Sequence, residues 1–285
     1  MKKFSLILIL TLVLPLVFCS CGNSSPDREI GGYEIEGELY DFLGKTDEKA
    51  AEFLAVYSLA DRYGVDFSSE KFEMEVEAEM SRILAEDYSG DADALDDDLD
   101  SFGIDDDIYE KIVEQDLLKT KVYLKLTESG TIETDRAKIK TELSNGGSVR
   151  IKRILIPYGV SEETKSDAEK GIKAAWDKIQ AGYDFDEVVK DMSKYTYATI
   201  GGSLEDGSYI VVKGKTEKGY EDVCFNLSVG EVSDPFETSS GYCIVKRYEL
   251  DLDLIDSVLD NLVTAYCEGQ YNMMLDEAAE KLLEK

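Results

Sequence analysis

The amino-acid sequence predicts an α+β protein in which a helical module is interrupted by a small domain of strands and helices. Three observations lead to this fold class. Apolar residues recur at helical spacing from about residue 47 to residue 143, and this spacing returns from residue 251 to the C-terminus. Between these regions, after the break SNGGS, short β-type segments alternate with amphipathic helices. This order predicts N-terminal helices and a returning C-terminal helix that form one module, with the small α/β domain inserted into it.

The N-terminus has the features of an export signal. The basic start MKK is followed by an apolar run at residues 4–18, which is short for a membrane span, and then by the polar, turn-rich CSCGNSSPD. An export signal that ends at a cysteine resembles that of a bacterial lipoprotein. We therefore expect residues 1–20 to be a lipoprotein signal peptide, residues 21–30 to be a tether, and the mature protein to be extracytoplasmic and lipid-anchored to the cell membrane.

Cys21 is the expected lipidation site. Small Ser20 precedes it and Gly22 follows it, whereas bulky Phe18 precedes the other candidate, Cys19. A plain secretory signal or an uncleaved anchor is the less favoured alternative. Under each of these interpretations, the rest of the chain functions outside the cytoplasm.

Residues 31–147 are expected to form the N-terminal part of the helical module. Ser68 is a suitable N-cap for the second helix, and Asp105 or Asp106 is a suitable N-cap for the third, because their side chains can accept hydrogen bonds from free N–H groups of the first turn. The helices are expected at about residues 47–63, 69–88, 106–126 and 134–143.

An acidic stretch at residues 90–107 separates two of these helices. Its Asp96, Asp98 and Asp100 have the spacing of calcium ligands, but Ser101 stands where an EF-hand loop requires glycine, and the glutamate at the twelfth position is missing. We therefore interpret this stretch as a solvated acidic linker between helices and predict no metal site.

The charge balance and the lack of histidine exclude several functions. The chain has 61 acidic and 31 basic residues, a formal net charge of −30 and no histidine. Nucleic-acid binding is disfavoured because it requires a basic surface that neutralises phosphates. Without histidine there is no Ser-His-Asp triad and no imidazole zinc ligand. The sequence predicts no cofactor.

Residues 148–250 are expected to form the inserted domain, and residues 251–285 the returning C-terminal helix. The first strand of the domain, at residues 149–156, places Arg153 on the same face as its apolar residues. Helices are expected at residues 161–182, at 185–192 and around the segment YEDVCFNL. Further strands are expected after TIGGSLEDG and at GYCIVKRYE.

Four motifs of this domain resemble, in the same order, those of parvulin-type (PpiC) peptidyl-prolyl isomerases. They are RILI, AGYDFDEVVKDMS, GGSL and YEDVCFNLSVGEVSDPFETSSGYCIVKR. Together with the lipoprotein signal and the flanking helices, the whole chain resembles the PrsA-type extracytoplasmic foldases and their SurA-like relatives. In that family the terminal helix packs on the helical domain to form a chaperone module.

The resemblance also implies which residues line the site. Two histidines of the parvulin site correspond to Arg153 and Cys243, and a third polar position falls near Lys194 or Tyr195. The expected site comprises Arg153, Cys243 and Tyr195 at the catalytic positions, and Leu204, Tyr220 and Phe225 as substrate-binding residues.

Two roles of Arg153 are open: it hydrogen-bonds a substrate carbonyl, or it pairs with a nearby acid and stabilises the fold, which we favour. Of the three remaining cysteines, Cys224 and Cys243 are candidates for a disulfide, and Cys267 is then left over.

The favoured hypothesis is a membrane-anchored foldase that binds unfolded exported polypeptides, prefers basic clients and has a degenerate isomerase site. An active prolyl isomerase with an altered site is the alternative, so enzymatic activity is left open. A solute- or wall-binding lipoprotein is a weaker alternative. A homodimer is also left open.

Overall fold

The computed structural model describes residues 25–158, 162–192 and 204–284. The predicted lipidation site Cys21 and the predicted site residue Tyr195 lie outside these residues. The chain divides into two compact units: Met1–Thr131 together with Met274–Lys285, and Ile132–Met273. One unit is helical and the other contains a small antiparallel sheet, so the predicted α+β class with a helical module is confirmed. The predicted domain boundaries remain predictions.

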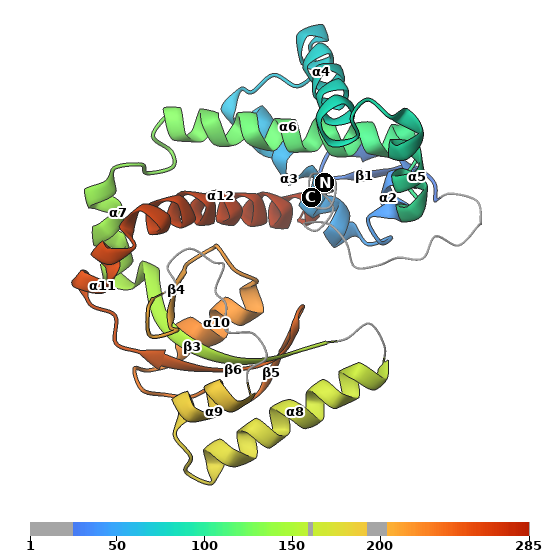
Figure 1. The fold of residues 1–285 in the computed structure, drawn as a ribbon. Coiled ribbons are helices and arrows are strands. Elements are labelled where there is room, and N and C mark those ends of the chain that lie inside the picture. The colour runs from blue at the N-terminus through green and yellow to red at the C-terminus, as the bar shows by residue number, and fades with distance from the viewer. Residues whose placement is uncertain (1–24, 159–161, 193–203, 285) are drawn as a thin grey trace. The chain divides into compact units, whose positions relative to one another are not determined.

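The first unit consists of helices and a two-stranded hairpin (Figure 1). Its central contact is between α3 (Asp47–Tyr63) and α6 (Asp106–Glu128), where the side-chain amide of Gln115 donates a hydrogen bond to the carbonyl of Phe53 (2.9 Å). The C-terminal part of α12 also belongs to this unit. The elements are β1 (Arg28–Ile30), β2 (Tyr33–Ile35), α2 (Gly37–Phe42), α3 (Asp47–Tyr63), α4 (Glu70–Asp87), α5 (Ala92–Phe102), α6 (Asp106–Glu128) and α12 (Leu259–Leu283).

Side-chain caps fix where these helices begin. The carboxylate of Asp105 accepts a hydrogen bond from the N–H of Ile108 (2.9 Å), as the sequence predicts. The predicted cap Ser68 is wrong by one residue, because it is the hydroxyl of Ser69 that accepts from the N–H of Phe72 (3.3 Å).

The interpretation of residues 90–107 as a linker is wrong, because most of this stretch forms helix α5. The Asp91 side chain caps its N-terminus by accepting a hydrogen bond from the N–H of Ala94 (3.3 Å), and Gly103 ends it in the left-handed conformation (φ 67°). Leu99 is 3% exposed and anchors the helix, while the aspartates lie mainly on its outer side. Across the described residues, no group of three or more His, Cys, Asp or Glu side chains is placed to hold a metal ion.

The second unit contains the inserted domain. Its elements are α7 (Arg136–Glu142), a short π-helical turn (Leu143–Gly147), β3 (Ser148–Pro157), α8 (Glu162–Gln180), α9 (Phe185–Met192), β4 (Tyr209–Val212), α10 (Lys218–Asn226), β5 (Phe236–Thr238), β6 (Gly241–Tyr248), α11 (Leu252–Ser257) and the N-terminal part of α12.

Within the part of the chain that the structure describes, no helix is both long and apolar enough to cross a membrane.

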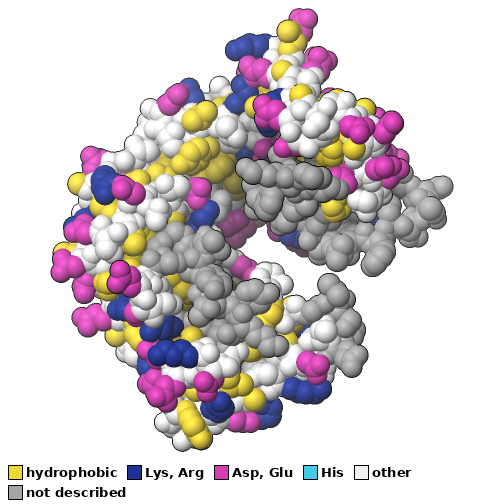
Figure 2. Space-filling model, viewed as in Figure 1, with side chains coloured by type: hydrophobic (Ala, Val, Ile, Leu, Met, Phe, Trp, Pro, Cys, Tyr) yellow, Lys and Arg dark blue, Asp and Glu magenta, His cyan; other side chains and the backbone are white. Residues whose placement is uncertain are grey.

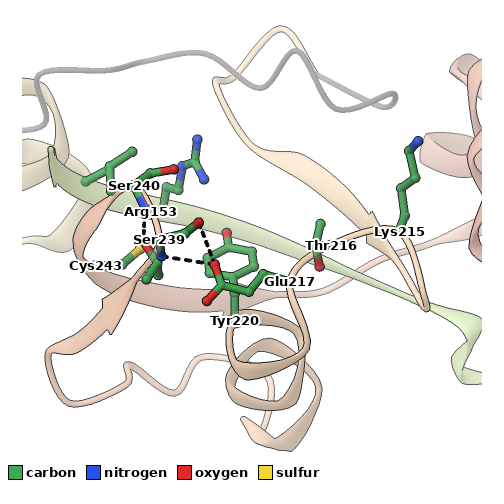
Figure 3. A pocket seen from close by; sticks show the side chains of 10 residues that line it. Arg153, Lys215, Thr216, Glu217, Tyr220, Ser239, Ser240 and Cys243 are labelled. Carbon is green, nitrogen blue, oxygen red and sulfur yellow. Dashed lines mark hydrogen bonds between the residues drawn. The ribbon is translucent and has the colours of Figure 1, made fainter. Parts of the chain in front are cut away.

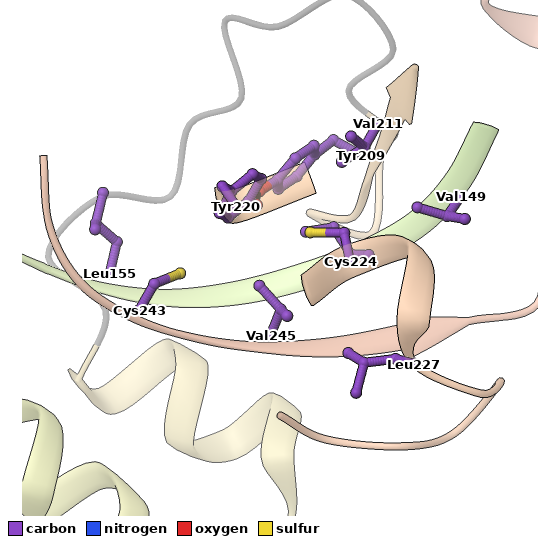
Figure 4. Packing of buried hydrophobic residues seen from close by; sticks show 10 residues of the cluster. Val149, Leu155, Tyr209, Val211, Tyr220, Cys224, Leu227, Cys243 and Val245 are labelled. Carbon is purple, nitrogen blue, oxygen red and sulfur yellow. Dashed lines mark hydrogen bonds between the residues drawn. The ribbon is translucent and has the colours of Figure 1, made fainter. Parts of the chain in front are cut away.

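A four-stranded antiparallel sheet with the order β4-β3-β6-β5 forms the centre of this unit. Helix α10 covers one face of the sheet, and α8 and α9 cover the other (Figure 1). Because side chains alternate along β3, its odd-numbered residues face α10 and its even-numbered residues face α8 and α9. The buried cluster on the α10 face consists of Val149, Ile151, Leu155, Tyr209, Val211, Tyr220, Cys224, Leu227, Cys243 and Val245 (Figure 4).

Candidate functional site

A cavity of about 210 Å³ opens on the α10 face of the sheet (Figure 3). Its floor comes from strands β3 and β6, and its rim comes from the loop before α10 and from the turn between β5 and β6. The lining residues are Arg153, Leu155, Lys215, Thr216, Glu217, Tyr220, Thr238, Ser239, Ser240 and Cys243. The cavity therefore combines a partly apolar floor with a rim rich in hydroxyl groups.

Strand register brings the two expected catalytic positions together. Leu155 lies directly opposite Cys243, and Arg153 lies opposite Val245, in the antiparallel pair of β3 and β6. Arg153 and Cys243 are therefore diagonal neighbours on one face, a separation that a long side chain can span. Tyr220 reaches the same cavity from α10.

The guanidinium of Arg153 lies against two aromatic rings. Its central carbon is 5.5 Å from the ring centroid of Tyr209 and 5.9 Å from that of Tyr220. Burial opposes the charged form, but both tyrosines and Cys243 favour it, and the pKa of Arg153 is raised on balance. No carboxylate among the described residues forms an ion pair with Arg153, so the favoured expectation of an acid partner is not met there.

The groups next to this guanidinium are neutral at physiological pH. Burial raises the pKa of Cys243 to about 12 and that of Cys224 to about 12, although Arg153 lowers both. Burial likewise raises the pKa of Tyr209 and Tyr220, whose hydroxyl groups hydrogen-bond each other. Both thiols are free, so the disulfide between Cys224 and Cys243 is not formed.

Charged groups at the rim already have partners. The exposed carboxylate of Glu217 accepts hydrogen bonds from the backbone N–H (3.1 Å) and the hydroxyl (2.9 Å) of Ser239. Lys215 forms an ion pair with Glu268 on α12. Figure 3 shows the Ser239–Glu217 bonds on one side of the cavity, with the guanidinium of Arg153 apart from them.

The structure places the predicted site residues unequally. Arg153, Cys243 and Tyr220 line the cavity, whereas Phe225 does not. Phe225 follows Tyr220 by five residues on α10, which turns its side chain about 140° away, and it packs against the buried cluster. Leu204 is not a lining residue either; its N–H donates a hydrogen bond to the carbonyl of Ser208 (2.8 Å).

Sequence reasoning missed the polar rim of the cavity. Thr238, Ser239 and Ser240 lie in the segment FETSSGYC, which carries part of the parvulin resemblance, so this motif was a usable signal. The loop residues Lys215 to Glu217 carry no such signal, because their position depends on how the chain returns from β4 to α10.

Comparison with known proteins agrees with this geometry. Residues 153–249 match the Rotamase family, described as a PPIC-type PPIASE domain. The foldase protein PrsA of Bacillus subtilis (strain 168) is 29% identical over 184 residues, which cover 62% of this chain and 58% of that protein. The foldase protein PrsA of Staphylococcus aureus (strain bovine RF122 / ET3-1) is 26% identical over 266 residues, covering 86% of this chain and 76% of that protein.

Solved structures give matches of the same kind. The crystal structure of PrsA from Bacillus subtilis is 23% identical and covers 88% of each chain, with a TM-score of 0.28. That of foldase protein PrsA from Streptococcus pneumoniae is 17% identical and covers 90% of this chain and 92% of its own, with a TM-score of 0.37. The match to the Bacillus subtilis sequence spans less than two thirds of that protein's length. Residues 153–249 are therefore a PpiC-type peptidyl-prolyl isomerase domain, and the resemblance of the chain to PrsA-type foldases is confirmed.

Proposed function

We propose that the chain is a PrsA-type folding factor that binds unfolded exported polypeptides, with a parvulin-type site that binds more efficiently than it catalyses. The observation that carries this proposal is the cavity in which Arg153, Tyr220 and Cys243 meet. These are the positions that the parvulin resemblance assigns to the site. Leu155 and Tyr220 offer apolar surface to a proline ring, and the hydroxyl groups of the rim offer hydrogen bonds to a peptide backbone.

The chemistry of the floor supports weak catalysis. Rotation about an X-Pro bond has a barrier of roughly 20 kcal/mol and breaks no covalent bond, so a catalyst must favour the twisted amide over the planar one. Here the thiols and phenols are neutral, and the guanidinium cannot act as a base. Stabilisation would come only from fixed dipoles and from Arg153.

An active isomerase with a non-standard site is the second candidate. The guanidinium of Arg153, which has no carboxylate partner among the described residues, favours it, because its N–H groups can donate a hydrogen bond to the prolyl nitrogen, whose lone pair localises as the amide twists out of conjugation. In this case, catalysis depends on Arg153.

The localisation and partners are part of the same proposal. We infer a lipid anchor on Cys21, an extracytoplasmic position and unfolded polypeptides as clients, with a homodimer left open. The net charge of −30 favours basic client segments at long range and disfavours nucleic acid. Figure 2 shows Asp and Glu side chains spread over the visible surface among Lys and Arg.

Exchange NMR on a proline-containing peptide separates the two candidates. The cis–trans exchange rate of Ac-Ala-Ala-Pro-Phe-NH2 is measured with the wild-type chain, with Arg153→Ala and with no protein. Binding without efficient catalysis predicts peptide shifts but an exchange rate near the uncatalysed value. A large acceleration that Arg153→Ala abolishes would instead establish the isomerase.

A client assay tests the folding function itself. The full chain is mixed with a reduced, aggregating basic client and with an acidic client of similar size, and light scattering is recorded. We expect aggregation to be suppressed, more strongly for the basic client at low salt. Unchanged scattering for both clients would contradict the proposed function.

A further inference from the structure

The charge of Arg153 is a feature of the cavity that the fold does not explain. A buried or half-buried cation is normally paired, because the loss of hydration is otherwise uncompensated. Among the described residues, the partners of this guanidinium are the rings of Tyr209 and Tyr220 and a hydrogen bond with the Tyr220 side chain, and the tyrosine and cysteine groups around it remain neutral. The floor of the cavity therefore carries one positive charge without an ionised counter-charge.

The remaining charges of the cavity do not cancel this one. Lys215 is occupied by Glu268, and Glu217 lies exposed at the rim, where Ser239 donates two hydrogen bonds to it. An exposed carboxylate is screened by water and salt, whereas a charge on the floor of a cavity acts in a less polar environment. A charged ligand that reaches the floor therefore interacts electrostatically more strongly with the guanidinium than with the carboxylate of Glu217.

From this arrangement we infer that the cavity selects a proline-containing peptide segment that carries a carboxylate, with an acidic residue directly before the proline. This inference rests on the proposed peptide-binding function. We place the proline ring against Tyr220, whose ring centroid lies 5.9 Å from the central carbon of the Arg153 guanidinium, so that the side chain of the preceding residue lies on the Arg153 side of the cavity. A guanidinium binds a carboxylate through charge-assisted, often bidentate, hydrogen bonds. The preference in the cavity is thus opposite in sign to the preference of the whole acidic surface.

Matched peptides test the inference on the wild-type chain. Ac-Ala-Glu-Pro-Phe-NH2 and Ac-Ala-Gln-Pro-Phe-NH2 differ in charge but hardly in shape, and Ac-Ala-Ala-Pro-OH carries its carboxylate at the C-terminus instead. Each is titrated in an NMR experiment at low salt. We expect the Glu peptide to bind about tenfold more tightly than the Gln peptide, as one charge-assisted contact implies. Tighter binding of the C-terminal carboxylate than of the Glu peptide would overturn the position assigned to the acidic residue.

Variants assign the preference to Arg153. In Arg153→Gln the Glu and Gln peptides should bind equally, and Arg153→Lys should retain part of the preference. Arg150→Gln is the matched control, because Arg150 lies on the same strand but on the opposite face, paired with Asp206; it should retain the full preference. The preference should also vanish below about pH 4, where the peptide glutamate becomes protonated.

The outcomes distinguish the inference from the proposed function. Equal binding of the Glu and Gln peptides to the wild-type chain overturns the acidic preference but leaves peptide binding intact. An acidic preference that survives in Arg153→Gln overturns the role of Arg153. If none of the three peptides binds, the proposed peptide-binding function fails, and the inference fails with it.

Discussion

Lys152 and Arg153 are neighbouring cations of β3, and they differ in whether a carboxylate pairs with them. Lys152 is 8% exposed and faces α9, where its ammonium group pairs with Asp186 (2.9 Å) and Asp206 (3.3 Å) and lies 5.3 Å from the ring centroid of Tyr248. Arg153 faces α10 and a cavity, and its described surroundings supply aromatic rings but no carboxylate. Carboxylates therefore neutralise the charge of Lys152, whereas no described carboxylate neutralises that of Arg153, the next residue of the strand.

This difference indicates different roles for the two faces of the sheet. On the α9 face, the carboxylates compensate the cost of burying a cation and connect β3 to elements distant in sequence. On the α10 face, an unpaired guanidinium is retained without any such stabilisation. A cation that has no carboxylate partner in the folded chain is expected where a ligand supplies the missing charge.

Removing the cation of the α9 face should have the largest effect on stability. Lys152→Met keeps the packing of the apolar stem but leaves Asp186 without its ion pair, and Asp206 retains only Arg150. Because both carboxylates are partly exposed, we expect the free energy of unfolding to fall by about 2 kcal/mol, less than for a fully buried pair. Urea denaturation followed by circular dichroism measures this change.

The control for this substitution lies on α8. Lys170 pairs with Asp167 at 3.0 Å, and both side chains are mostly exposed. Lys170→Met should change the unfolding free energy by less than about 0.5 kcal/mol. Equal effects of the two substitutions would show that the network around Lys152 contributes no more than a surface pair.

Removing the cation of the α10 face should barely alter stability. Arg153→Met abolishes two cation–π contacts but also removes an unpaired charge, and it leaves no described carboxylate without a partner. The two contributions oppose each other, so we expect a change within about 1 kcal/mol in either direction. A loss as large as that of Lys152→Met would instead assign Arg153 a structural role.

Much of the fold was predictable because local signals agreed with tertiary packing. Helix α9 occupies the predicted residues, and Asp105 caps α6 as expected. Helix α5 was missed because its aspartates resemble a solvated linker, whereas its formation depends on the cap Asp91 and on the burial of Leu99. Strands of three residues, such as β1 and β2, are too short to display a period of two.

The site was predictable only where a motif marks it. The parvulin resemblance led to Arg153, Cys243 and Tyr220, and all three line the cavity. It could not show that Arg153 lacks an acid partner, since the positions of carboxylates from distant segments follow from the folded chain. It also included Phe225, which does not line this cavity, because a position along α10 does not by itself give the side that faces the cavity.

Acid titration should reveal the carboxylates of the α9 face. Burial opposes ionisation of Asp206, but hydrogen bonds from Ser208 together with the charges of Lys152 and Arg150 lower its pKa from 3.8 to about 2. A pKa lowered in the folded state means that the stabilisation is present above pH 3.8 and is lost as the pH falls towards 2. In Asp206→Asn, the melting temperature should therefore fall less between pH 4 and pH 2 than in the wild type. Parallel curves for the two proteins would contradict this account.

The smallest expected effect is on the rate of thiol labelling. This rate compares how substitutions on the two faces of the sheet change the exposure of Cys224 and Cys243. Cys224 and Cys243 have pKa values raised to about 12 by burial, so at pH 8 only about one thiol in ten thousand is ionised. In a chain whose Cys19, Cys21 and Cys267 are replaced by serine, the reaction with Ellman's reagent should proceed only as fast as the protein unfolds. Lys152→Met should then accelerate labelling, whereas Arg153→Met should not, although the cation it removes is the nearer one to Cys243. Faster labelling in Arg153→Met alone would mean that the α10 face opens locally and that Arg153 holds it closed.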